Sequence, residues 1–308
     1  MTHDLETLEK PLRNSVVTIG NFDGVHKGHV ALINKVKEDA ESTGGQSVVI
    51  TFDPHPIKIM SPGNGPPLIT PTHQKLELIE NTKIDVIFCI PFTKDFAAIS
   101  ARDFVKIILI NKLGIKGIII GYDYTFGHNR EGNIELLQEM GGLFGFFVHV
   151  VAPVHVGNTL VSSTSIRELI QAGNLSEAKK MLGRDYQICG TVVKGKNRGA
   201  RLLGFPTANL KLIDELTPKV GVYAVKVLID GCVCNGLTNI GYNPTFGDNP
   251  FSVETFLLDF SGELLNKTIK VNFIARLRDE KPFDTVKDLA EQIGRDILQA
   301  RDLFSVHP

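Results

Sequence analysis

The amino-acid pattern changes part-way along the chain, and this change constrains the fold more than any other feature. In the first half, apolar runs typical of buried strands alternate with helix-like runs, which predicts a parallel β-sheet covered by helices on both faces. The expected strands are Val16–Ile19, Ser47–Phe52, Val86–Ile90, Gly117–Gly121 and Phe146–Val151, and the expected helices include Val30–Ala40, Thr72–Asn81 and Ser100–Lys112. We therefore expect an α/β unit in this part of the chain.

The second half is β-rich, and its strand-like runs are separated by Gly, Pro, Asn or Asp rather than by helices. This pattern predicts a small antiparallel β-barrel, followed by a terminal helix near Asp284–Asp302. Two short helices, Ser165–Gly173 and Ser176–Gly183, are expected before the pattern changes. A chain of 308 residues is long enough for two domains, which we place at residues 1–184 and 185–308. The expected barrel strands are Ile188–Val193, Val222–Ile229, Asn235–Ile240, Val253–Phe260 and Thr268–Leu277.

Charge and cysteine content restrict the class of protein. The 33 Lys and Arg residues nearly cancel the 34 Asp and Glu residues, so no basic surface for nucleic acid or an anionic membrane is indicated. The four cysteines lack the spacing of a zinc site, and the first residues lack the apolar core of a signal peptide. We expect a cytoplasmic protein with small-molecule ligands and no nucleic-acid or membrane partner; the sequence does not indicate an oligomeric state.

The run Gly20–His29, G-N-F-D-G-V-H-K-G-H, lies between an expected strand and an expected helix. Its glycines allow a ligand to approach the backbone closely, and the N-terminus of the helix attracts anions. His26 and His29 are three residues apart, so both can face a phosphate there and stabilise the charge that develops on it. Asp23 is a weaker candidate for holding a metal or an amine. The alternative interpretation is a tight turn with two surface histidines.

Three further segments carry side chains suited to nucleotide binding. Thr51–Pro56 and Gly121–Gly127 follow expected strands, and the carboxyl ends of parallel strands meet at one edge of a sheet. Ser162–Arg167 opens a helix, where the hydroxyls of Ser163 and Thr164 and the guanidinium of Arg167 suit phosphate oxygens. Taken singly, Ser163 and Thr164 are more typical of helix caps and Arg167 of a solvated charge, so the prediction depends on the segments sharing one pocket.

A second set of candidate residues lies among the β-rich runs. Thr207 and Asn209 share one face of an extended segment, and their oxygens are hard ligands suited to Mg²⁺. Upstream, Gly195 and Arg201 belong to a glycine-rich basic segment, which is typical of a flap over phosphates. Glu254 lies in an expected strand and is a candidate base for an attacking hydroxyl; the alternative for it is an exposed strand residue.

Both halves together resemble the bifunctional riboflavin kinase/FAD synthetases of bacteria, from about Ser15 to Phe304. The resemblance is carried by G-N-F-D-G-V-H-K-G-H, T-F-D-P-H-P, G-Y-D-Y-T-F-G, S-S-T-S-I-R, G-F-P-T-A-N-L, N-I-G-Y-N-P-T-F, V-E-T-F-L-L-D-F and R-L-R-D-E-K-P-F. It implies a Rossmann-like nucleotidyltransferase domain that transfers AMP from ATP to FMN, giving FAD and pyrophosphate. It also implies a barrel that phosphorylates riboflavin with ATP.

The resemblance further implies roles for individual residues. His26 and His29 would act at the α-phosphate, Glu254 would be the base on the ribityl hydroxyl, and Thr207 and Asn209 would hold Mg²⁺. The residues expected at ATP and its phosphates are Gly20, Phe22, Asp23, Gly28, Ser163, Thr164, Arg167, Gly195 and Arg201, and those expected at the flavin are Asp53, Asp123, Phe126 and Arg278.

Two alternatives stay open at this point. In the first, the chain retains only one of the two activities and the other domain is a flavin- or nucleotide-binding module. In the second, the chain is a flavin-binding regulator that performs no chemistry. The products formed from riboflavin and ATP distinguish the three hypotheses.

Overall fold

The computed structural model describes residues 2–3, 5, 8–194, 207–212, 215–242 and 251–306. The chain divides into two compact units, Met1–Ser163 and Thr164–Pro308. Among the helices of these described residues, none has both the length and the apolar character that a membrane span requires.

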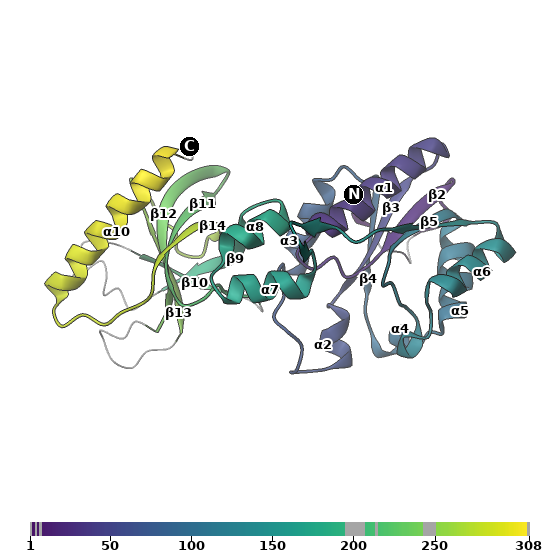
Figure 1. Cartoon of the computed structure of the whole chain (residues 1–308), viewed down its shortest axis with the longest axis horizontal. Helices are drawn as coiled ribbons and strands as arrows, with labels where there is room; N and C mark the ends of the chain where they lie inside the picture. The colour runs from purple at the N-terminus through teal and green to yellow at the C-terminus, as the bar shows by residue number, and fades with distance from the viewer. Residues whose placement is uncertain are drawn as a thin grey trace. The chain divides into compact units, whose positions relative to one another are not determined.

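A six-stranded parallel sheet forms the centre of the first unit, in the order β1-β4-β3-β2-β5-β6 (Figure 1). Its strands are β1 (Thr2–His3), β2 (Ser15–Ile19), β3 (Ser47–Asp53), β4 (Val86–Pro91), β5 (Ile115–Gly121) and β6 (Phe147–Val151). The five longer strands confirm the expected parallel sheet, and their order is that of a Rossmann-like fold. The chain reverses its direction of progress across the sheet between β2 and β5, so the carboxyl ends of these two strands form the usual ligand-binding crevice.

Helices cover both faces of this sheet because alternate strand residues supply an apolar surface to each side. Val16, Val49 and Ile119 pack with α1 (Lys27–Ser42) and α3 (Thr72–Glu80) in one buried cluster. Val17, Ile50 and Ile118 belong to a second buried cluster on the other face of the sheet, which also includes residues of η2 and α6. The remaining helices of the unit are α2 (Pro56–Met60), α4 (Lys94–Ala97), α5 (Ala101–Asp103), η2 (Phe104–Leu113), η3 (His128–Arg130) and α6 (Ile134–Phe144).

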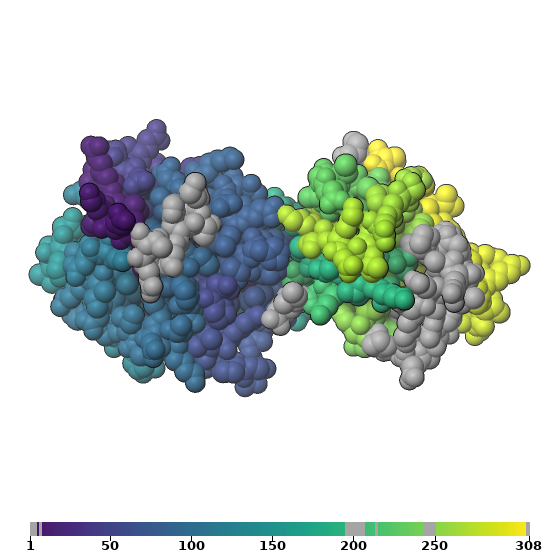
Figure 2. Space-filling model, turned by 180° about the vertical axis from the view of Figure 1, so that it is seen from behind, coloured from purple at the N-terminus to yellow at the C-terminus, as the bar shows by residue number. Residues whose placement is uncertain are grey.

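The first unit differs from the expected helix at residues 100–112 and contains a contact that was not expected. The helix begins as the short α5 and continues as a π-helix, η2, rather than as one α-helix. The start of the chain adds a buried contact as well: Leu5, Leu8 and Leu12 pack against the larger core cluster. In the space-filling view, the dark purple atoms of the early residues lie on the surface of this unit (Figure 2).

The second unit contains a closed antiparallel barrel with the strand order β10-β13-β12-β11-β14-β9. Its elements are α7 (Ser163–Gln171), α8 (Leu175–Leu182), β9 (Tyr186–Val193), β10 (Thr207–Lys211), β11 (Gly221–Ile229), β12 (Cys232–Gly241), β13 (Ser252–Leu257), β14 (Thr268–Arg278) and α10 (Val286–Val306). The barrel and its terminal helix confirm the predicted all-β part. The strand β10 was not among the expected strands.

The terminal helix α10 lies along the outside of the barrel (Figure 1). Ala300 and Phe304 of this helix pack with Val222, Ala224 and Leu237 of the barrel wall in one buried cluster. Inside the barrel, the rings of Tyr186 and Tyr223 contact Phe273. The helix therefore extends the apolar core of this unit beyond the ring of strands.

Candidate active sites

The segment after β2 places two histidines side by side at the N-terminus of α1. His26 is the N-cap of this helix, and its Nδ1 accepts a hydrogen bond of 3.3 Å from the backbone N–H of His29. The two imidazole rings are stacked, with centroids 3.6 Å apart and an angle of 16° between the planes. Because Nδ1 of His26 is an acceptor, a proton on the neutral ring lies on Nε2. The pair is thus ordered at the positive end of a helix dipole, where anions bind.

The turn before the histidines is held in an unusual backbone conformation. Phe22, Gly24 and Val25 all have positive φ angles, of 51°, 87° and 38°, and the side chains of Phe22 and Val25 are buried. The rings of Phe22 and His29 are in a T-shaped arrangement, with their centroids 5.1 Å apart. Burial of two apolar side chains stabilises a turn that their backbone conformation disfavours.

Asp23 connects this turn to the residues before α3. The residue is 3% exposed, and its carboxylate accepts the backbone N–H groups of Ile69, at 3.1 Å, and Thr70, at 3.0 Å. The Thr70 hydroxyl in turn accepts the N–H of Gly24 at 3.0 Å. This geometry gives Asp23 a structural task in the loop, whereas its expected role at ATP stays a prediction.

The ends of β3 and β5 lie at the same edge of the sheet as this turn. Asp53 ends β3, and its Oδ1 accepts the Thr72 hydroxyl at 2.6 Å. Asp123 follows β5 and is exposed. Phe126 is stacked on Tyr124 and packs against the core, so the core supports one side of its ring. The structure therefore brings three of the four sequence-predicted segments to one edge.

The fourth segment begins α7. The hydroxyl of Ser163 donates to the backbone oxygen of Asp23 at 2.9 Å, which ties Ser163 to the histidine turn. Thr164 and Arg167 follow in the same helix, and the division between the two units passes between Ser163 and Thr164. The roles expected for these two residues stay predictions.

Lys75 of α3 is a residue near this edge that the sequence analysis missed. Its side chain is buried and its Nζ donates to the backbone oxygen of Phe52, the residue before Asp53, at 2.8 Å. Burial lowers the pKa of Lys75 below its ordinary value of 10.5. A lysine within a helical pattern normally indicates a solvated face, so no signal in the sequence distinguishes it.

In the barrel, the strand pairing places the second set of candidate residues on one face. Asn209 of β10 lies opposite Glu254 of β13, and Glu254 also lies opposite Asn239 of β12. Residues directly opposite each other point to the same side of a sheet. The Thr207 hydroxyl donates to Oε2 of Glu254 at 3.4 Å, and the Ser252 hydroxyl donates to Oε1 at 3.3 Å. Ser252 and Asn239 are further polar neighbours that the sequence analysis did not single out.

A pocket of about 660 Å³ lies beside this row of side chains. Its lining includes Lys194, Thr207 and Phe260, together with the carboxylates Asp259 and Glu263. Its volume falls within the range of small-molecule sites. Gly195 and Arg201, the expected flap residues, lie outside the described residues.

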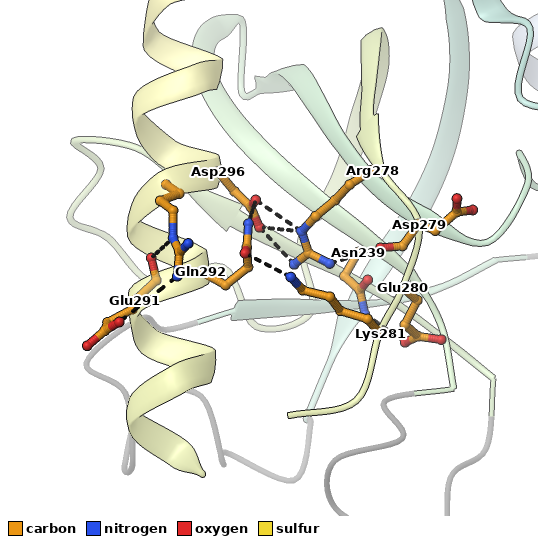
Figure 3. A network of polar contacts seen from close by, with 9 residues as sticks. Asn239, Arg278, Asp279, Glu280, Lys281, Glu291, Gln292 and Asp296 are labelled. Carbon is orange, nitrogen blue, oxygen red and sulfur yellow. Dashed lines mark hydrogen bonds and ion pairs between the residues drawn. The ribbon is translucent and has the colours of Figure 1, made fainter. Parts of the chain in front are cut away.

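Arg278 is part of a polar network between β14 and α10 (Figure 3). Its guanidinium contacts both carboxylate oxygens of Asp296, which is 3% exposed. Gln292 donates to the same carboxylate at 2.8 Å, and Lys281 donates to Gln292 at 3.0 Å. The side chain of Arg278 thus anchors the terminal helix, and its expected contact with a flavin stays a prediction.

Comparison with known proteins divides the chain in the same general way. A family model described as FAD synthetase matches residues 8–165, and one described as riboflavin kinase matches residues 182–304. The exact domain boundary proposed at residues 184 and 185 stays a prediction, because the two matches leave residues 166–181 between them.

Two bacterial relatives match along nearly their whole length. The bifunctional riboflavin kinase/FMN adenylyltransferase of Buchnera aphidicola subsp. Acyrthosiphon pisum is 37% identical over 297 residues, which are 96% of this chain and 95% of that protein. The protein of the same name from Escherichia coli K12 is 35% identical and covers 97% of this chain and 95% of its own.

A solved structure matches both units. The crystal structure of a protein from Streptococcus pneumoniae, named a macrolide-efflux protein, has a TM-score of 0.85 and 31% sequence identity, and 98% of each chain is covered. Its name concerns that protein, whereas the family models and the bacterial relatives agree with each other over both units of this one. This chain therefore belongs to the bifunctional riboflavin kinase/FMN adenylyltransferase family.

Proposed function

We propose that the chain phosphorylates riboflavin with ATP to give FMN, and then adenylylates FMN with a second ATP to give FAD and pyrophosphate. The observation that carries the proposal is that polar residues gather at two separate places, one within each unit. The parallel sheet carries the stacked histidines in the crevice at the carboxyl ends of β2 and β5. The barrel carries the Glu254 carboxylate beside the uncharged side chains of Thr207 and Asn209.

In the first unit, a phosphate oxygen of FMN would attack the α-phosphorus of ATP, and the bond from that phosphorus to the pyrophosphate oxygen would break. His26 and His29 would donate hydrogen bonds to the oxygens that become more negative in this step. The stacking of the two rings and the N-cap bond of His26 fix their positions before the substrates bind. Ser163, which is bonded to the backbone oxygen of Asp23, would bind the polyphosphate, and the same role expected for Thr164 and Arg167, which belong to the second unit, stays a prediction.

In the second unit, Glu254 would accept the proton of the riboflavin 5′-hydroxyl as the hydroxyl oxygen attacks the γ-phosphorus of ATP, and the bond from that phosphorus to the bridging oxygen would break to release ADP. The hydroxyls of Thr207 and Ser252 hold this carboxylate by hydrogen bonds, so its oxygens stay oriented on the outer side of the strands. The pocket beside Thr207 would take the nucleotide.

The residues around Glu254 fit Mg²⁺. No group of three or more His, Cys, Asp or Glu side chains suited to a metal occurs among the described residues. Mg²⁺ often takes few protein ligands and completes its shell with water and substrate phosphates. Thr207 and Asn209 would supply the protein oxygens, and the ion would neutralise charge on the transferring phosphate.

Product analysis tests the whole proposal. The purified chain is incubated with riboflavin, ATP and Mg²⁺, and the flavins are separated by chromatography. FMN is expected first and FAD afterwards. FMN alone would remove the transferase activity from the proposal, and riboflavin binding without ADP release would support a regulator instead. These substrates fit a cytoplasmic enzyme that needs no nucleic-acid or membrane partner.

A further inference from the structure

The buried lysine of α3 has no part in the chemistry described above, yet it lies beneath the same edge of the sheet. Lys75 belongs to the first turn of α3 and is 3% exposed, whereas lysine is almost never fully buried without a partner. Its Nζ donates to the backbone oxygen of Phe52 at 2.8 Å. That oxygen belongs to the last peptide before Asp53, so the lysine contacts the end of β3.

Ionisable groups on three other segments oppose the effect of burial on Lys75 without cancelling it. Burial lowers the pKa of Lys75, and the nearby Cys89 of β4, Asp23 and Asp53 act in the opposite direction. Asp23 is itself buried and belongs to the histidine turn. Lys75 therefore lies near ionisable groups of the turn after β2, the end of β3 and the middle of β4.

The start of α3 is connected to the site by three sets of bonds. The residues just before it, Ile69 and Thr70, donate to the Asp23 carboxylate. Thr72, at its first position, donates to Asp53. Lys75, one turn later, donates to Phe52. Together these bonds fix the spacing between the end of β3 and the turn that carries the stacked histidines.

We propose that Lys75 is a positioning residue for adenylyl transfer, which holds the end of β3 at a set distance from the His26–His29 turn. This inference rests on the proposed function of the first unit. Lys75 touches neither substrate in this proposal. It acts through the backbone of Phe52 and through the charge of Asp23, and a displacement of either segment would move groups that surround the reacting phosphates.

A purely structural role for Lys75 makes a different prediction. Removing one partner of a buried polar contact costs stability, so a purely structural role predicts a lower free energy of unfolding without a selective loss of adenylyl transfer. Methionine has nearly the length of lysine but neither its charge nor its donors. Lys75→Met therefore separates a role in packing, which methionine satisfies, from a role in positioning, which it does not.

The test compares Lys75→Met, Lys75→Arg and a control, Lys106→Met, in the full chain. Lys106 is an exposed lysine of η2 in the same unit. FMN-to-FAD and riboflavin-to-FMN conversion are both measured over a range of ATP concentrations, with thermal unfolding as the check on folding. For Lys75→Met we expect the transferase kcat to fall about 10- to 100-fold, with a smaller change in KM and an unchanged kinase rate.

Lys75→Arg keeps the cation and its donors, so it should recover part of the lost transferase rate, and Lys106→Met should match the wild type. A folded Lys75→Met variant with full transferase activity would overturn the inference. Equal loss of both activities would also overturn it. If Lys75→Met does not fold, the uncharged variant Lys75→Gln takes its place in the comparison. A folded Lys75→Arg variant with no more transferase activity than Lys75→Gln would then contradict positioning by the cation. A wild-type chain that makes no FAD would contradict the proposed function instead.

Discussion

Arg278 binds Asp296 through two nitrogens, with its Nε 3.0 Å from both carboxylate oxygens and its Nη2 2.8 Å from Oδ2. This pair joins the last residue of β14 to the middle of α10, and it lies within the network of Figure 3. The carboxylate is nearly inaccessible, so its charge depends on the guanidinium and on Gln292 for compensation.

Replacing Arg278 by Met should therefore lower the free energy of unfolding of the second unit by about 3 kcal/mol, because it leaves a buried carboxylate without its main partner. Circular dichroism in urea measures this, since the chain has no tryptophan. The exposed pair of Glu291 and Arg295 provides the control: Glu291→Gln should change the unfolding free energy by less than about 0.5 kcal/mol. The double variant Arg278→Met/Asp296→Leu should recover part of the loss, and no recovery would contradict this account.

The transferase site predicts a selective loss of FAD formation. His29→Ala removes one ring of the stacked pair, and we expect FMN-to-FAD conversion to fall about 100-fold or more. Riboflavin phosphorylation should not change, because the kinase residues belong to the other unit. His155→Ala, at an exposed histidine of β7 (His155–Val156), is the matched control. Equal loss of both reactions in His29→Ala would show that the two sites are not independent.

The barrel site predicts the reverse selectivity. In Glu254→Gln the amide keeps one oxygen, which can accept the hydrogen bond of Thr207 or of Ser252, but its NH2 group cannot accept the other bond and the side chain no longer accepts a proton from the substrate. We expect riboflavin phosphorylation to fall about 100- to 10,000-fold, while added FMN is still converted to FAD. An unchanged kinase rate in a folded Glu254→Gln variant would exclude Glu254 as the base.

Glu215 gives the second unit a defined dependence on pH. Burial raises the pKa of this carboxyl to about 7, against the opposing effect of the backbone N–H of Cys189. The folded state therefore binds more protons than the unfolded state between the ordinary pKa of 4.5 and about 7. The contribution of Glu215 to the free energy of unfolding is therefore fully present below this interval and is lost as the pH rises through it.

Glu215→Gln should remove this dependence and make the second unit more stable at pH 8 by up to about 3 kcal/mol. Urea unfolding at pH 5 and pH 8 measures the effect. Glu177→Gln, at an exposed glutamate of α8, should leave the pH dependence as it is in the wild type. A Glu215→Gln variant with the wild-type slope would show that other groups cause it.

Regular elements with strong periodicity could be predicted from the sequence. The five longer strands of the sheet and the barrel with its terminal helix follow from apolar runs and their spacing. The strand β10 was missed because T-A-N-L-K is short and polar on one face. The π-helical part of residues 104–113 was missed because its apolar residues also fit an α-helical period.

The candidate site could be predicted from the sequence only where its residues lie close together within one motif. His26 and His29 occur in one turn, and Thr207 and Asn209 in one strand. By contrast, the bond from Ile69 to Asp23 joins residues 46 positions apart, and no local pattern predicts such a pairing. Likewise, only the folded structure shows that Lys75 is buried and that Arg278 faces Asp296.

The alternation along β10 and β13 has a consequence for how these strands can vary. Ala208, Val253 and Thr255 point to the buried side, while Thr207, Asn209 and Glu254 occupy the positions between them. An insertion of a single residue in either strand would exchange the two faces of that strand beyond the insertion. Side chains of the candidate site would then point inward, and the side chains that are now buried would point outward. Related chains can therefore carry substitutions in these strands but not insertions or deletions. Differences in length are expected in the connections between strands.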